Sequence, residues 1–182
     1  MDIITMSETW LKNNPALLEY LTIPGYTIVF RNRESIKGGG VGAYTRDSKE
    51  FKHRKDIELL QPDLEHLWLE IPGRNKHSKA LLGVFYRSER ILTYSDWIER
   101  IEALLGHLTV EWDSLLILTG DMNIDMLQSR SPTTRQYQAV LDAFGFHQMI
   151  KQPTRIAKTF RTIIDHIVSS RPQRITHSDV IP

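Results

Sequence analysis

Residues 115–123 are Leu-Leu-Ile-Leu-Thr-Gly-Asp-Met-Asn, an apolar run that ends in a glycine and then presents polar side chains. Such a run bounded by a glycine is typical of a buried strand. Residues two apart in an extended chain project to the same side, so Asp121 and Asn123 are predicted to converge beyond the strand end. Asp121 could hold or deprotonate a water molecule, and Asn123 could donate to a phosphate oxygen. The alternative is an Asp-x-Asn turn with local hydrogen bonds.

Outward from this strand, short apolar runs alternate with Gly, Pro and Asn breaks, which indicates a strand-rich chain. Strands are predicted at residues 2–5, 26–31, 40–45, 65–71, 80–86, 115–119 and 163–169. A helical period predicts helices over 96–108, with Ser95 as N-cap, and over 133–144, and a shorter helix is possible around 15–20. Helices that fall between strands indicate a layered α/β or α+β fold.

Composition limits the classes of protein that fit. With 182 residues and 41% hydrophobic content, the chain is long enough for one domain, residues 1–182, with a sizeable core. The absence of cysteine excludes disulfides and cysteine-ligated zinc. There is no apolar run of about 18 residues and no secretory signal in the first ten residues, so we expect an intracellular protein without a membrane span.

The net charge of +1 conceals an uneven distribution. Residues 31–55 hold eight Lys and Arg against three Asp and Glu, and residues 151–182 hold six against two. Residues 56–150 hold eight against fourteen. Two basic stretches around an acidic middle could form the edges of a surface that follows a phosphate backbone beside a metal site, although solvated loops are the simpler interpretation.

Two further acidic residues are associated with predicted strands. Glu8 follows the apolar run 3–6, and hard oxygen ligands of this kind suit Mg²⁺; the alternative is an exposed residue beside a helix cap. Asp165 lies inside the run 163–168, where burying a carboxylate is costly unless a partner pairs with it. His166 is next to it, but successive strand side chains point to opposite faces, so His166 is interpreted as structural.

Two other motifs bear on phosphate binding. Tyr86 and Arg87 close the apolar run 81–85, and a phenol and a guanidinium at a strand end could both bind a phosphate; an ordinary strand terminus is the alternative. Residues 38–40 are Gly-Gly-Gly without a following helix or a Lys-Ser ending, which excludes a P-loop and indicates a flexible turn.

The order of the motifs is more specific than any one of them. The sequence contains SETWL (7–11), GGGVGAY (38–44), VFYR (84–87), LTGDMNIDML (118–127), QPTR (152–155) and IIDHI (163–167). In this order they resemble the endonuclease domains of non-LTR retrotransposons, which are related to abasic-site repair endonucleases within the endonuclease/exonuclease/phosphatase superfamily. The resemblance extends from residue 1 to about residue 170. It implies an α/β (α+β) fold, a four-layer sandwich of two packed mixed β-sheets flanked by helices.

The resemblance also implies a role for each matching residue. Glu8 resembles a metal-binding glutamate that would hold Mg²⁺, with Mn²⁺ as the alternative cation. Asp121 resembles the aspartate that orients and activates the attacking water, and Asn123 the asparagine that contacts the scissile phosphate. Tyr86 is similar to a phosphate-contacting tyrosine. Asp165 is similar to the carboxylate that orients a catalytic histidine.

Two departures from the family pattern concern the ends of the chain. Members of the family begin with a strand that carries an asparagine of the metal site, and here the sequence starts about one strand later. They also end in a Ser-Asp-His motif, whereas Ser178 and Asp179 are followed here by Val180. The resemblance therefore leads us to expect a domain truncated at both ends and impaired in activity.

The implied activity is metal-dependent hydrolysis of a DNA phosphodiester, in which target-site nicking leaves a 3′-hydroxyl that primes reverse transcription. DNA and a covalently linked reverse transcriptase domain are the implied partners, and the nucleus is the implied location. Two alternatives stay open at this point. One is a phosphomonoesterase of the same superfamily, and the other is a non-catalytic, degenerate remnant.

Overall fold

The computed structural model describes residues 1–11, 19–33, 36–75 and 77–181. The strands are β1 (Ile3–Ser7), β2 (Tyr26–Arg31), β3 (Val41–Arg46), β4 (Lys52–His53), β5 (Glu65–Ile71), β6 (Ala80–Tyr86), β7 (Leu115–Asp121), β8 (His147–Gln148), β9 (Arg155–Ile156), β10 (Arg161–Thr162) and β11 (Asp165–Ser169). The helices are α2 (Lys55–Glu58), α3 (Tyr94–Glu111), α4 (Pro132–Ala143) and a 3-10 turn at Pro172–Arg174.

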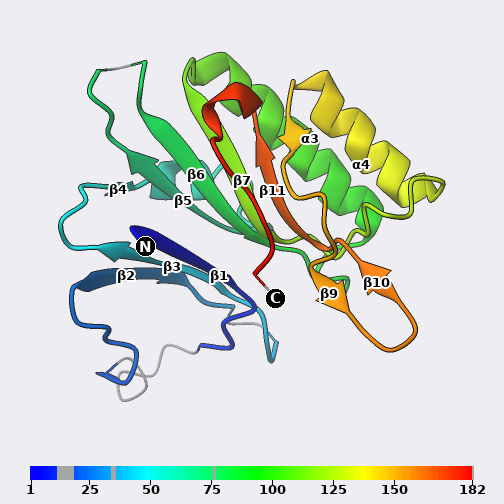
Figure 1. Ribbon diagram of the computed structural model, residues 1–182, viewed down its shortest axis with the longest axis horizontal. Helices are drawn as coiled ribbons and strands as arrows, with labels where there is room; N and C mark the ends of the chain where they lie inside the picture. Colours follow the sequence, from blue (N-terminus) through cyan, green and yellow to red (C-terminus); the bar gives the residue numbers. More distant parts are fainter. Residues whose placement is uncertain (12–18, 34–35, 76, 182) are drawn as a thin grey trace.

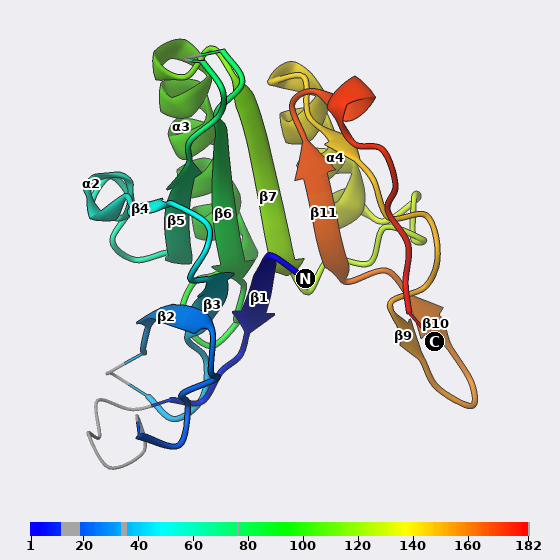
Figure 2. The same ribbon diagram turned by 60° about the vertical axis from the view of Figure 1, so that its left-hand side comes forward.

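Two sheets pack face to face, and helices cover the outer face of the larger one (Figures 1 and 2). The larger sheet has the order β4-β5-β6-β7-β11-β8 and is mixed, because β6 and β7 run parallel with α3 as the connection between them. The smaller sheet has the order β1-β3-β2 and is antiparallel throughout. Strands β9 and β10 form a separate hairpin that projects away from the sheets. This arrangement confirms the layered α/β architecture of packed sheets with flanking helices.

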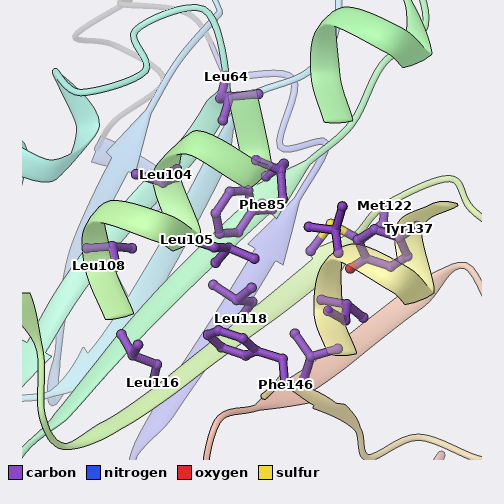
Figure 3. Close-up of a cluster of buried hydrophobic side chains, with 14 of the residues drawn as sticks. Leu64, Phe85, Leu104, Leu105, Leu108, Leu116, Leu118, Met122, Tyr137 and Phe146 are labelled. Atoms are coloured by element: carbon purple, nitrogen blue, oxygen red, sulfur yellow. The ribbon is translucent and has the colours of Figure 1, made fainter. Parts of the chain in front are cut away.

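The two faces of the larger sheet bury different clusters. Strands β6 and β7 direct one set of side chains at α3 and α4, where Phe85, Leu116 and Leu118 pack against Leu104 and Leu105 (Figure 3). The alternate residues face the smaller sheet, and there Leu67, Leu69, Val84 and Tyr86 pack against Val41 and Ala43. Fully burying each large apolar side chain contributes about 1.5–3 kcal/mol, so both faces hold the layers together. The period-two alternation thus fixes which residues of each strand can reach a site between the sheets.

The long elements lie where the sequence predicts them, with small differences at their ends. Helix α3 begins earlier than expected because Thr93, not Ser95, is its N-cap: the Thr93 hydroxyl oxygen accepts from the Asp96 amide at 3.2 Å. Most of the helix considered around residues 15–20 lies outside the described residues. The short elements β4, β8, β9, β10 and α2 were not predicted. No helix among the described residues is long and apolar enough to cross a membrane.

A fully buried histidine lies on β5, on the face that is turned toward the helices. His66 accepts a hydrogen bond at Nδ1 from the Trp68 indole N–H at 2.7 Å, and its Nε2 donates to the Gln61 carbonyl at 3.0 Å. The bond at Nδ1 needs the neutral ring, because a protonated Nδ1 could not accept it. Burial, reinforced by the positive charge of Arg31, lowers the pKa of His66 from 6.5 to about 4.

We predict that acid destabilises the fold through His66. The unfolded chain takes up this proton below pH 6.5 and the folded chain only near pH 4, so the stabilisation is complete above 6.5 and is lost as the pH falls toward 4. Between about pH 7 and pH 4.5 the free energy of unfolding should fall by about 2–3 kcal/mol from this group alone. Urea unfolding at both pH values measures the loss. The variant His66→Gln should show a smaller loss, and an unchanged loss would contradict the assignment.

Candidate active site

One row of side chains crosses four neighbouring strands of the larger sheet. Glu65 on β5 pairs with Tyr86 on β6, Tyr86 pairs with Asp121 on β7, and Asp121 pairs with Asp165 on β11. Directly paired residues project to the same face of a sheet. Because Tyr86 belongs to the cluster between the sheets, the whole row faces the smaller sheet. Residues far apart in the sequence are therefore neighbours here.

Glu8 joins this row from the smaller sheet. It follows β1 directly, and its carboxylate lies near enough to the Tyr86 phenol to raise the pKa of that phenol. Its backbone lies between two anchored positions: the β1–β3 ladder ends at the pair Ser7 and Val41, and the Thr9 amide then donates to the Gly40 carbonyl at 3.1 Å. The strand end of one sheet thus delivers a carboxylate to the row on the other.

Backbone strain is concentrated at the same place. Among the described residues, the non-glycine positions with positive φ are Glu8 (56°), Trp10 (57°) and Asn123 (48°), in the segments that follow β1 and β7. Left-handed backbone costs an L-residue roughly 1–2 kcal/mol, least for Asn. Strain of this kind persists where the surrounding structure imposes it, and it often marks functional sites. The segments that contain Glu8 and that follow Asp121 both carry it.

The environment of Asp121 disfavours its charged form. Burial is the main cause, and the nearby carboxylates of Asp165 and Glu8 add to it; together they raise the pKa of Asp121 to about 6. The Asn123 amide, which donates to Asp121 Oδ1 at 2.9 Å, and the positive charge of Arg155 act in the opposite direction. Carboxylates that repel one another in this way form a site that a cation would stabilise.

The Tyr86 phenol stays protonated at neutral pH. Burial, the Glu8 carboxylate beside the phenol and the charge of Asp121 raise its pKa to about 12, against a smaller opposing effect of Arg33. The phenol is therefore a hydrogen-bond donor directed at carboxylate oxygens. A phosphate oxygen bound at this position would be an acceptor of the same kind.

Asn123 and Arg87 hold each other, which corrects one expectation. The Asn123 amide nitrogen donates to the Arg87 carbonyl at 2.7 Å, and the Arg87 guanidinium donates to the Asn123 carbonyl at 3.1 Å. Arg87 is only 2% exposed and lies over the rings of Tyr94 and Trp97 on the helix side. It is not placed to bind a phosphate in the row. Its place in the structure is to hold the segment that carries Asn123.

Asp165 is at the site, but not for the reason deduced from its position in the sequence. Strand β11 begins at Asp165, and its carboxylate is exposed rather than buried inside an apolar strand. The Thr154 hydroxyl oxygen accepts from the amides of Ile164 and Asp165, each at 3.2 Å, and holds this strand start. Asp165 also lines a cavity of about 320 Å³ between β1 and the β7–β11 pair. The strand boundary explains why no buried partner is needed.

His166 lies on the opposite face of β11 from Asp165, as strand alternation predicts. Its ring is 1% exposed, stacks on Tyr137 with centroids 5.5 Å apart, and its Nε2 is 2.9 Å from the Ile124 carbonyl. Burial lowers the pKa of His166, so the ring is neutral. Within the described part of the chain, no hydrogen bond joins Asp165 to a histidine side chain.

Two contributions to the site were not predicted from the sequence. Glu65 occupies one end of the row, and Arg155 approaches closely enough that its charge lowers the pKa of Asp121. Arg155 lies within the QPTR stretch, for whose residues the resemblance implied no role. The charge and position of that motif were the available signal.

The donor set fits a hard divalent cation bound through few protein ligands. In the described ranges, no group of three or more His, Cys, Asp or Glu is arranged to hold a metal ion. Mg²⁺ commonly takes one or two carboxylates and keeps several waters, so it does not need such a group. Glu8 is the exposed carboxylate on the smaller sheet, and Asp121 and Asp165 are its acidic neighbours. One or two of these carboxylates could contact the cation between the sheets, with water completing its coordination.

Comparisons with known proteins identify the family and the fold. The model of the endonuclease/exonuclease/phosphatase family matches residues 1–182, and the chain belongs to that family. The endonuclease domain of TRAS1, a telomere-specific non-LTR retrotransposon, has a similar structure, with a TM-score of 0.67 and 13% identity over 92% of this chain and 71% of that one. No curated protein sequence matches significantly.

Two abasic-site endonucleases are also similar in structure. The AP endonuclease LMAP of Leishmania major gives a TM-score of 0.72 at 12% identity, over 94% of this chain and 70% of its own. The AP endonuclease of Archaeoglobus fulgidus gives 0.60 at 18% identity, over 94% and 77%. At these identities the likeness shows the fold, and it confirms the two-sheet sandwich expected from the sequence.

Proposed function

We propose that this member of the endonuclease/exonuclease/phosphatase family is a metal-dependent DNA endonuclease. The observation that carries the proposal is the row of Tyr86, Asp121 and Asp165 on adjacent strands, joined by Glu8 from the other sheet. A phenol donor and clustered carboxylates are the groups that phosphodiester hydrolysis with a bound cation requires.

Each residue has a distinct task in this proposal. Glu8 holds Mg²⁺, or Mn²⁺ in its place, and the bound cation would neutralise charge on the phosphate. Asp121 would orient a water molecule and accept its proton as the oxygen attacks phosphorus; the bond between phosphorus and the 3′-oxygen breaks, and the 3′-oxygen takes up a proton to leave as the 3′-hydroxyl. The Tyr86 hydroxyl and the second N–H of the Asn123 side-chain amide, whose first N–H donates to the Arg87 carbonyl, would donate to phosphate oxygens, where charge develops. Asp165 is assigned the orientation of an acid–base histidine by resemblance alone.

An exposed basic hairpin beside the site favours DNA over a small phosphomonoester. Residues 155–161 of the β9–β10 hairpin are all exposed and include Arg155, Lys158 and Arg161. The Arg155 guanidinium lies over the Phe160 ring, 5.6 Å from its centroid. Positive charge that extends beyond the reacting phosphate is useful only if the substrate continues along the surface.

We predict that the double variant Lys158→Glu, Arg161→Glu weakens DNA binding at moderate salt by at least about tenfold. Its plot of log affinity against log salt should lose about two units of slope, because two phosphate contacts disappear. Fluorescence anisotropy with a labelled duplex measures both quantities. The matched control is Arg135→Glu on α4, behind the larger sheet. A salt dependence like that of the wild type in the double variant would exclude the hairpin from DNA binding.

We further propose a role in retrotransposition. The nick would be made at a retrotransposon target site in the nucleus, and its 3′-hydroxyl would prime a covalently linked reverse transcriptase domain. Support comes from the motif order and from the fold shared with the TRAS1 endonuclease domain. A DNA polymerase should extend the nicked strand without phosphatase treatment, and a blocked 3′ end would contradict this role.

Relaxation of supercoiled plasmid tests the activity itself. The chain should nick plasmid in Mg²⁺ and stop when EDTA is added, without releasing phosphate from a phosphomonoester. Phosphate release without nicking would favour the phosphomonoesterase. A DNA mobility shift that persists in EDTA, with no cleavage in Mg²⁺, would favour the non-catalytic remnant.

A further inference from the structure

Beside the row lies an ion pair that the proposed chemistry does not use. Arg33 donates to both carboxylate oxygens of Glu65, through Nε at 3.0 Å and through Nη2. The two side chains are only 5% and 14% exposed. A bidentate pair fixes the orientation of both side chains. The attraction between the two charges offsets the cost of removing them from water only when this geometry is good. Its position is therefore well determined.

Glu65 also makes a third hydrogen bond, which leads toward Glu8. Its Oε1 accepts from the Gly40 amide at 2.9 Å. The carbonyls of Gly40 and Gly39 accept in turn from the amides of Thr9, at 3.1 Å, and Trp10, at 2.9 Å. These two amides follow Glu8 directly in the chain, where the backbone has positive φ. Glu65 thus anchors the turn at residues 39–40, and this turn in turn anchors the strained segment that contains Glu8.

The glycines of this turn are tightly packed, which corrects the expectation of a flexible turn. A Cβ built on Gly39 would lie 2.3 Å from the Arg33 guanidinium carbon, and one on Gly40 would lie 2.7 Å from the Thr9 hydroxyl oxygen. Both glycines have positive φ. The turn can therefore transmit the position of the ion pair to Glu8.

The same ion pair also contacts Tyr86. The Arg33 guanidinium carbon lies 5.6 Å from the centroid of the Tyr86 ring, and Glu65 is the cross-strand partner of Tyr86. Arg33 and Glu65 therefore touch both halves of the Glu8–Tyr86 contact, one through the turn and the other through the ring.

We propose that Arg33 and Glu65 are positioning residues that hold Glu8 and Tyr86 in the geometry that binds the divalent cation. The claim that this geometry binds a cation rests on the proposed function. The claim that the pair fixes the backbone beside Glu8 does not. Neither residue needs to touch the substrate. Residues that orient metal ligands typically change metal affinity by about 10- to 100-fold when they are replaced.

The test uses variants that separate positioning from stability. Arg33→Met with Glu65→Leu removes both charges together, so no buried charge is left unpaired, and an apolar pair of this kind usually preserves folding. Glu65→Gln alone keeps an oxygen for the Gly40 amide and should be intermediate. The matched control is Glu70→Gln on the same strand, which breaks the 2.7 Å pair with Arg54 away from the row.

Two measurements follow on the full chain, namely amide hydrogen exchange at Thr9 and Trp10, and binding of Tb³⁺ as a luminescent probe for the cation. In the double variant both amides should exchange at least about tenfold faster, and Tb³⁺ should bind at least about tenfold more weakly. Glu70→Gln should leave both quantities within about twofold of the wild type, as expected for an ion pair distant from the site.

The outcomes distinguish this inference from the proposed function. If Glu8→Gln weakens Tb³⁺ binding but the double variant does not, the positioning role is wrong and the metal site stands. If Glu8→Gln leaves Tb³⁺ binding unchanged, the metal site of the proposed function fails, and the exchange rates at Thr9 and Trp10 alone decide the positioning role. Unchanged exchange at both amides overturns it.

Discussion

Replacing Asp121 by Ala should reduce plasmid nicking by at least about a hundredfold, which corresponds to about 3 kcal/mol or more of transition-state stabilisation. Asp121 is central in the row, between Tyr86 and Asp165, and the charges of Asp165 and Glu8 both raise its pKa. Its neighbour Asp165 is exposed, so Asp121 is the more buried carboxylate of the pair and the one assigned to the water. The initial rate of plasmid nicking in Mg²⁺ measures the effect.

Two further variants show whether the loss is chemical. Asp121→Asn keeps the shape of the side chain and an oxygen for the Asn123 amide, but it removes the charge and the proton acceptor. It should be impaired nearly as strongly as Asp121→Ala. Asp113→Ala removes an exposed carboxylate just before the same strand and should nick at the rate of the wild type. Near-normal nicking by Asp121→Ala would remove this residue from the mechanism.

The sequence was sufficient for what depends on local periodicity. The alternation of apolar residues placed β2, β5 and β6 at their observed bounds, and the helical period located α3 and α4. The change from apolar to polar residues also placed Tyr86, Asp121 and Glu8 at or just beyond strand ends, although β7 extends two residues further than predicted and includes Asp121. Single residues at strand ends are visible in a sequence because the change from apolar to polar is abrupt.

What the sequence could not supply is the register between strands. The pairing of Asp165 with Asp121 depends on where β11 begins, and the apolar residues 163 and 164 hid that boundary. Arg87 likewise resembled a phosphate ligand in the sequence. Its burial against Tyr94 and Trp97 is a tertiary contact, which the sequence does not reveal. The Arg33–Glu65 pair joins a loop to a strand far along the chain, and no local pattern predicts such contacts.

The glycine that precedes Asp121 shows how the fold and the site constrain one another. Gly120 lies inside β7 with φ at +131°, paired with Phe85 on β6 and with His166 on β11. A Cβ at this position would lie 1.9 Å from the Phe85 carbonyl oxygen, 2.9 Å from its carbonyl carbon and 3.0 Å from its nitrogen. All three are backbone atoms of the neighbouring strand, so a change of rotamer cannot relieve the collision.

Gly120→Ala should therefore lower the free energy of unfolding by at least about 3 kcal/mol, because the parallel pair β6–β7 must separate near its end, beside the buried Phe85. Urea unfolding followed by tryptophan fluorescence measures the change. Gly145→Ala is the matched control: Gly145 also has positive φ, at +70°, but a Cβ there meets nothing within 4 Å. It should cost only the backbone strain, about 1 kcal/mol. If the two variants were equally stable, the close approach of the strands would not be what requires glycine before Asp121. Because Tyr86 and Asp121 are paired immediately after Phe85 and Gly120, folded Gly120→Ala protein should also nick plasmid more slowly than the control.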